Sequence, residues 1–143
     1  MLLQARAVLR TALDAVLPPR CLKCGDILGG ENGLCSPCWQ KLSWMSPPCC
    51  ACCGQPFQFQ SAPGSLCGAC LVQRPAYDRA RAVLRYDDES RDLILGFKHA
   101  DRTELAPSLA RWMARSGAEL IADCALIVPV PLHWTRLAVR RFN

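Results

Sequence analysis

Residues 18–25 read Pro-Pro-Arg-Cys-Leu-Lys-Cys-Gly, and residues 47–54 read Pro-Pro-Cys-Cys-Ala-Cys-Cys-Gly. The two stretches align at an offset of 29 residues, and each is followed by a second Cys-x-x-Cys motif. These second motifs align at an offset of 32, because the second copy contains three extra loop residues. The chain therefore repeats one cysteine pattern, and eight of its 11 cysteines fall into two groups of four.

The setting of the cysteines decides between disulfides and metal binding. Paired Cys-x-x-Cys motifs bind metal in a reducing compartment, whereas exported cysteine-rich proteins form disulfides. The first 20 residues lack the uninterrupted apolar run of a signal peptide, because Arg6, Arg10 and Asp14 interrupt it. No stretch is long and apolar enough to span a bilayer. We therefore expect a cytoplasmic protein without an integral membrane segment, whose cysteines are thiolates.

The second copy offers two choices of ligand pair, because both Cys49 with Cys52 and Cys50 with Cys53 have Cys-x-x-Cys spacing. The internal repeat separates them. Cys50 and Cys53 align with the first cysteine pair of the other copy, whereas Cys49 and Cys52 align with an arginine and a lysine. We predict that Cys49 and Cys52 are spare thiols, with an exchange of one of them into the site as the alternative.

Two closed zinc sites follow from this assignment. Tetrahedral Zn2+ takes four sulfur ligands, and two residues between cysteines let one turn present both sulfurs to the ion. A redox Cys-x-x-Cys pair is the alternative, but such a motif would occur once and beside a βαβ pattern. A site with four cysteines has no open position, so we expect two structural Zn2+ ions without catalytic chemistry. The predicted ligands are Cys21, Cys24, Cys35 and Cys38 in the first site, and Cys50, Cys53, Cys67 and Cys70 in the second.

The zinc sites also change the charge of the chain. The formal net charge of +5 treats every cysteine as neutral. Eight thiolates and two Zn2+ ions lower this charge to +1, so the basic composition is weak support for nucleic-acid binding.

Three segments are expected along the chain. Residues 1–18 predict an amphipathic helix that packs on the rest of the protein, with binding to a membrane surface as the alternative. Residues 19–72 form the double zinc ribbon, in which glycine-rich turns favour short β-hairpins. Cysteines then disappear until Cys124, and residues 73–143 are expected to form a separate domain.

The pattern of residues 73–143 indicates an α/β fold. Apolar and polar residues alternate over 82–86, as in a half-buried strand. A helix capped by Ser90 and a second helix with Leu105, Leu109, Trp112 and Met113 on its inner face follow. Residues 125–128 are continuously apolar, as in a strand buried on both faces.

An arginine-rich segment, residues 132–143, follows that predicted strand and is expected to be a loop. Open α/β sheets bind ligands at the carboxyl ends of their strands, and arginine suits a phosphate or pyrophosphate. A solvated basic loop without a ligand is the alternative.

The order of these motifs resembles the ComF-type competence protein family, which joins a double zinc ribbon to a phosphoribosyltransferase-like domain. The resemblance rests on the two ribbons, the strand with Tyr86, Lys98 after a short helix, and two motifs near the end of the chain. These motifs are Pro-Val-Pro-Leu-His at 129–133 and Arg-Arg-Phe-Asn at 140–143. The family usually has glycine at the position of Arg141. The resemblance implies a pyrophosphate-binding loop, for which Lys98, Arg136 and Arg140 are the candidate residues.

The resemblance also implies that this chain is the amino-terminal fragment of a longer protein. Family members continue into further strands and a loop that binds the ribose phosphate, and the α/β domain is partial here. The fragment itself is therefore not expected to catalyse phosphoribosyl transfer, and whether the intact protein is an enzyme stays open.

Three functions are compatible with this organisation. The first is a ComF-like role in natural competence and DNA uptake, with the zinc ribbons as a docking module for single-stranded DNA or for DNA-uptake and recombination proteins. The second is a phosphoribosyltransferase whose full-length form binds phosphoribosyl pyrophosphate and Mg2+. The third is direct binding of nucleic acid by the ribbons, with Trp39, Trp44, Phe57 or Phe59 as stacking platforms, for which packing over zinc is the alternative.

Overall fold

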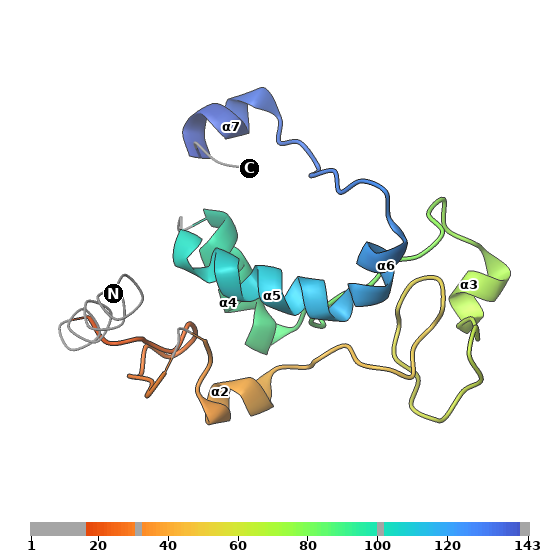
Figure 1. Cartoon of the computed structure of the whole chain (residues 1–143), viewed down its shortest axis with the longest axis horizontal. Coiled ribbons are helices and arrows are strands. Elements are labelled where there is room, and N and C mark those ends of the chain that lie inside the picture. Colours follow the sequence, from red (N-terminus) through yellow and green to blue (C-terminus); the bar gives the residue numbers. More distant parts are fainter. Residues whose placement is uncertain (1–16, 31–32, 100–101, 141–143) are drawn as a thin grey trace, which may run out of the picture.

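The computed structural model describes residues 17–30, 33–99 and 102–140. The amphipathic helix expected over residues 1–18 therefore lies almost wholly outside the described residues. Six α-helices and one 3-10 helix are found in the described part of the chain (Figure 1). They are α2 (Ser36–Lys41), α3 (Gly68–Val72), α4 (Asp88–His99), η1 (Thr103–Leu105), α5 (Ala106–Ser116), α6 (Ala118–Asp123) and α7 (Trp134–Arg140).

The two ribbons contain less β-structure than the glycine-rich turns predict. Each first cysteine pair lies in a tight loop closed by one antiparallel bridge, Arg20 with Ile27 and Cys49 with Pro56. Each second cysteine pair instead lies at the start of a short helix, α2 or α3. The predicted hairpins are thus reduced to isolated bridges, to which the first ribbon adds a parallel one between Cys21 and Gly33. Neither helix was expected from the sequence.

The first ribbon shares a hydrophobic core with the helices that follow it. The buried residues of this core are Leu22 and Leu42 from the ribbon, Leu93 from α4 and Leu105 from η1. Figure 1 shows α4 and α5 side by side, with the first ribbon and α2 along the same side of the molecule. The second ribbon lies with α3 at the other end of the long axis.

Helix α4 begins at Asp88, so its cap is Asp87, three residues before the expected cap Ser90. The Asp87 carboxylate accepts a hydrogen bond from the Ser90 backbone N–H at 2.9 Å, and the Ser90 hydroxyl accepts one from the Asp87 N–H at 3.0 Å. This reciprocal pair satisfies two N–H groups that a helix start otherwise leaves unbonded. The second expected helix corresponds to α5 with Gly117 at its end, although Met113 is 64% exposed and does not face the core.

The two strands predicted in residues 73–143 are not observed. In the segment 82–86 only Leu84 forms a bridge, to Trp44, and Leu84 packs against the core of the first ribbon. Of the three apolar residues that alternate here, only Leu84 packs on the ribbon, whereas Ala82 and Tyr86 are exposed. Residues 125–128 are extended but exposed, with Leu126, Ile127 and Val128 each at least 70% accessible, and the described residues place no strand beside them. The α/β architecture is accordingly not confirmed.

The arginine-rich segment 132–143 was expected to be a loop, and this expectation is wrong for its described part. Residues Trp134–Arg140 form α7, and the Leu137 N–H donates to the His133 carbonyl at its start. Leucine, alanine and arginine favour helix, and the two prolines that precede the segment do not interrupt it. Within the described residues, no helix combines the length and the hydropathy needed to cross a membrane.

Candidate metal centres

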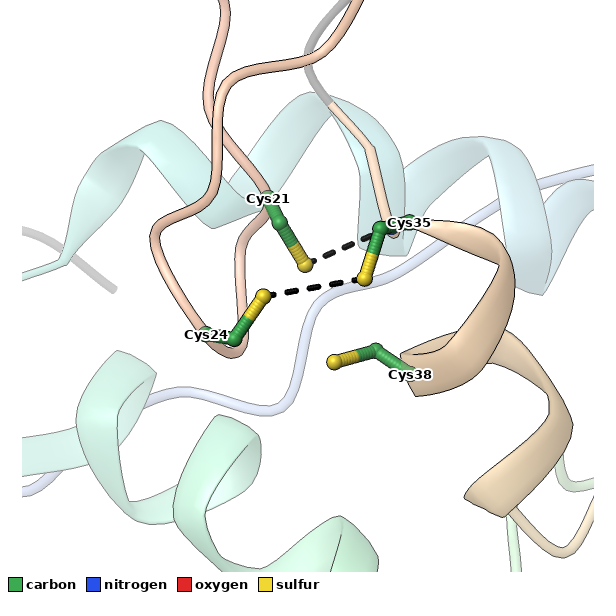
Figure 2. A group of neighbouring side chains, drawn as sticks. All are labelled: Cys21, Cys24, Cys35 and Cys38. Carbon is green, nitrogen blue, oxygen red and sulfur yellow. Dashed lines mark hydrogen bonds between the residues drawn. The ribbon is translucent and has the colours of Figure 1, made fainter.

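The first centre brings together the four cysteines predicted for it. Cys21 and Cys24 lie on the loop after Pro19, whereas Cys35 precedes α2 and Cys38 lies within it (Figure 2). The four sulfur atoms lie within 4.8 Å of one another. The Cys24 and Cys35 sulfurs are 3.6 Å apart, and the Cys35 backbone N–H donates to the Cys21 sulfur at 3.3 Å.

The second centre repeats this geometry with Cys50, Cys53, Cys67 and Cys70, again within 4.8 Å. The Cys53 and Cys67 sulfurs are 3.6 Å apart, and the Cys67 N–H donates to the Cys50 sulfur at 3.2 Å. Equivalent atoms in the two ribbons therefore make equivalent contacts. The structure places all eight predicted ligands in two sets of four.

The two cysteines predicted to be spare thiols lie outside the second group. Cys52 is only 2% exposed, and its sulfur lies 3.9 Å from the Tyr77 carbonyl oxygen. Cys49 is half-buried and forms the bridge to Pro56. Neither cysteine belongs to a group of four.

One sulfur in each ribbon is prepared for ionisation by the backbone. Burial opposes ionisation of Cys21, but N–H groups of Cys24, Cys35 and Lys23 lower its pKa from 9.0 to about 6. Burial likewise opposes ionisation of Cys50, and N–H groups of Cys67, Cys53 and Cys52 lower its pKa to about 6. Hydrogen bonds to a charged group favour that charged form. Each ribbon thus has one sulfur that ionises first.

A second sulfur in each group resists ionisation unless a cation is present. Burial and the neighbouring sulfurs Cys53, Cys67 and Cys50 raise the pKa of Cys70, and burial also raises the pKa of Cys38. Like charges this close cannot coexist unless a positive ion lies between them. A divalent ion that prefers tetrahedral sulfur satisfies this requirement, and the two groups fit two structural zinc ions. With four sulfur ligands each, the sites leave no position for substrate.

A separate basic pocket lies near the end of the described chain. Lys98 at the end of α4 and Thr135, Arg136, Val139 and Arg140 of α7 line a volume of about 380 Å3. The Arg140 guanidinium also donates to the Phe97 carbonyl at 3.4 Å, which holds α7 near the end of α4. The three candidate pyrophosphate residues therefore lie around one pocket.

Comparison with known proteins agrees with the two zinc ribbons. A family model of the double zinc ribbon domain matches residues 12–71. Competence protein F of Haemophilus influenzae is 32% identical over 130 residues, in an alignment that covers 87% of this chain and 55% of that protein. This chain is similar to a ComF-type protein, and its residues 12–71 match the double zinc ribbon domain. It spans about half the length of the curated relative that it matches, and no solved structure matches it.

The two ribbons contain a feature that the cysteine spacing does not reveal. Cys35 and Cys67 are the N-caps of α2 and α3, so each second cysteine pair is held by a helical turn. Proline two residues after Cys35 could have indicated the first of these helices, since proline is favoured in a first helical turn. The second helix has no comparable signal, because Gly68 follows Cys67.

Proposed function

We propose that this chain is part of a protein that acts in natural competence, in the uptake of DNA, and that its zinc ribbons are a docking module. The observation that carries the proposal is the 32% identity to Competence protein F over 130 residues. The proposal includes a cytoplasmic location, because eight thiolates in two zinc sites require a reducing compartment. The closed zinc sites support a structural role for the ribbons, which stabilise a surface and do not carry out chemistry.

A chimera tests this proposal within a complete protein. The region of Competence protein F that aligns with this chain would be replaced by the chain in Haemophilus influenzae, and transformation frequency would be measured. We expect the chimera to restore transformation well above the deletion strain. A matched chimera with Cys21→Ser and Cys50→Ser should fail, because each ribbon loses a ligand. A chimera with two bound zinc ions and normal expression that transforms no better than the deletion strain would refute the proposal.

The second ribbon supports docking to a protein more than contact with DNA. Residues 47–72, which form the second ribbon, contain no aspartate, glutamate, lysine, arginine or histidine. Binding to the phosphate backbone depends on lysine and arginine, and four thiolates around Zn2+ leave this ribbon with a negative charge. Trp39 and Trp44 stack on each other with centroids 4.0 Å apart, which supports packing over their use as base-stacking platforms. We therefore favour DNA-uptake or recombination proteins as partners of this ribbon.

Titration of the chain with labelled single-stranded DNA distinguishes these partners. At low salt we expect weak binding at most, lost when the salt concentration is raised, because the second ribbon offers no cation to the backbone. Tight binding that Phe59→Ala weakens would instead support direct recognition by the ribbon, since Phe59 is 69% exposed.

A second candidate function is the binding of phosphoribosyl pyrophosphate with Mg2+ by the full-length protein, as in a phosphoribosyltransferase. The pocket lined by Lys98, Arg136 and Arg140 supports it, because three cations around one space suit a pyrophosphate. Calorimetric titration with inorganic pyrophosphate and Mg2+ tests this pocket. Arg136→Ala should weaken binding at least about tenfold, as loss of a charge-assisted contact does, whereas Arg74→Ala outside the pocket should not. Equal affinities of the two variants would exclude this site.

A further inference from the structure

The two zinc ribbons differ in the residue that follows their first cysteine. Leu22 follows Cys21, and at the offset of 29 residues its counterpart is Ala51. Leu22 is 3% exposed and packs with Leu42, Leu93 and Leu105 in the core that the ribbon shares with the helices. Ala51 is only half-buried and belongs to no core cluster. The first zinc loop therefore contributes a side chain to the helical core, and the second does not.

Two polar contacts attach the same loop to the helices. The Arg102 guanidinium donates to the Leu22 carbonyl at 2.9 Å, from a position that is 80 residues later in the chain. Lys23 forms an ion pair with Glu89 in the first turn of α4. Arg102 in turn packs against Gly96 of α4, where an added Cβ would lie 3.2 Å from its Cδ. The two residues between Cys21 and Cys24 thus contact α4 and the segment before η1.

The second ribbon is organised around its own cysteines. Its buried cluster consists of Cys50, Cys52 and Cys70, with Phe57 and Leu66 packed against it, and it includes no residue of α4 or α5. Beyond the ribbon, the Ala80 N–H donates to the Cys52 carbonyl at 2.7 Å, and Arg81 donates to the Ala51 carbonyl while it pairs with Glu119 of α6. These contacts go to the following segment and to α6. This ribbon also lies away from α4 along the long axis of the molecule (Figure 1).

We infer that zinc binding at the first site and the folding of α4 and α5 form one cooperative unit, whereas the second zinc site folds independently of these helices. Without Zn2+ the four sulfurs no longer hold the loop, and Leu22 leaves a core whose other residues come from α4 and η1. The inference does not rest on a role in competence, but only on zinc in the two cysteine groups. Because Lys98 lies on α4, the basic pocket then depends on the first zinc ion and not on the second.

The tryptophans report on this unit selectively. Trp44 stacks on Trp39, and both contact the ring of Trp112 from α5 edge-on, with centroids 5.3 and 6.1 Å apart. Residues 45–111 contain no tryptophan, so the second ribbon is silent in tryptophan fluorescence. The fourth tryptophan, Trp134 of α7, is already 73% exposed, so a red shift of the emission reports loss of the contact between the first ribbon and α5.

Matched double variants test the inference. Cys21→Ser with Cys38→Ser removes the first and last ligands of one site, and Cys50→Ser with Cys70→Ser removes the same ligands of the other. Each variant should retain one zinc ion per chain by elemental analysis. We expect the first variant to shift tryptophan emission to the red and to accelerate amide exchange in α4 and α5 at least about tenfold. The second variant should leave both measurements as in the unaltered chain.

Chelation of the unaltered chain gives an independent measurement. Two zinc ions should leave, and tryptophan emission should change with only one of them. In the variant that lacks the second site, the emission change should coincide with the release of its single zinc. Protected α4 and α5 after loss of the first site, or equal loss of protection in both variants, would overturn the inference. Loss of both zinc ions from the Cys21→Ser, Cys38→Ser variant would equally contradict an independent second site.

Discussion

The glycine after each first cysteine pair has the same backbone conformation in both ribbons but different surroundings. Gly25 has φ +81° and Gly54 has φ +74°, a region that residues with a Cβ rarely adopt. A Cβ on Gly25 would meet nothing within 4 Å. A Cβ on Gly54 would lie 2.7 Å from the Ala80 backbone oxygen, so the backbone would have to move. A side chain at Gly25 would therefore cause backbone strain alone, whereas one at Gly54 would cause the same strain and a steric clash.

Alanine substitution at these glycines should have unequal effects. Gly25→Ala should lower the free energy of unfolding by about 1–2 kcal/mol, the cost of a left-handed conformation for a residue with a side chain. Gly54→Ala should lower it by roughly 1–3 kcal/mol more, since it adds an overpacked contact. Urea unfolding of both variants measures the difference. Equal losses would show that the contact with Ala80 relaxes without cost.

The sequence predicts the ligands of the two metal centres well, because the two copies of the repeat can be aligned with each other. The offset of 29 residues excluded Cys49 and Cys52 from the second site, and the structure groups the other four. The same offset pairs Leu22 with Ala51, but no local pattern shows that Leu22 enters a core completed by residues more than 70 positions later. Ligand spacing is local chemistry, whereas burial depends on the tertiary fold.

At the scale of elements, α4 depends on a buried hydroxyl in its first turn. Ser90 is fully buried, and its hydroxyl donates to the Arg85 carbonyl at 2.6 Å while it accepts from the Asp87 N–H. One side chain therefore satisfies backbone groups on both sides of the turn that leads into α4. Removing it would leave buried polar groups without a partner.

The substitution Ser90→Ala should therefore destabilise the protein by about 1–3 kcal/mol, the cost of unsatisfied buried hydrogen-bonding groups. Ser36→Ala is the control, because its exposed hydroxyl only accepts from the Gln40 side chain at 3.3 Å. The control should change the free energy of unfolding by no more than about 0.5 kcal/mol. Thermal and urea unfolding followed by circular dichroism measure both. A Ser90→Ala variant as stable as the control would show that the turn does not depend on this hydroxyl.

Helices were predicted better than strands for a physical reason. The spacing of Leu105 and Leu109 follows the helical period, and capping residues mark where α4 and α5 begin or end. A β-strand is stabilised by hydrogen bonds to a neighbouring strand, and the periodicity of one segment does not indicate whether such a neighbour exists. Residues 82–86 alternate although only Leu84 packs on the first ribbon, and residues 125–128 are apolar although no described segment pairs with them.

At the scale of the whole molecule, two arginines of the segment after the second ribbon pair with α6, and one of them, Arg81, also contacts the ribbon. The Arg81 side chain is only 14% exposed, forms an ion pair with Glu119, and donates to the Ala51 and Ala80 carbonyls at 3.3 and 2.8 Å. Arg79 pairs with Asp123 at 2.8 Å, but both side chains of this pair are more than 40% exposed. The two ion pairs thus join the segment after the second ribbon to α6, at different degrees of burial.

Burial should decide which arginine matters. Arg81→Ala should lower the free energy of unfolding by about 1.5–3 kcal/mol, the range for hydrogen bonds that involve a charged group. Arg79→Ala should cost no more than about 1 kcal/mol, as exposed ion pairs do. Arg81→Lys should cause an intermediate loss of free energy of unfolding, because lysine keeps the charge but lacks the planar guanidinium group that donates to several acceptors at once. Urea unfolding ranks the three variants, and amide exchange at Ala80 locates the change. If Arg79→Ala were as costly as Arg81→Ala, the second ribbon would be held by long-range charge attraction and not by the buried guanidinium contacts.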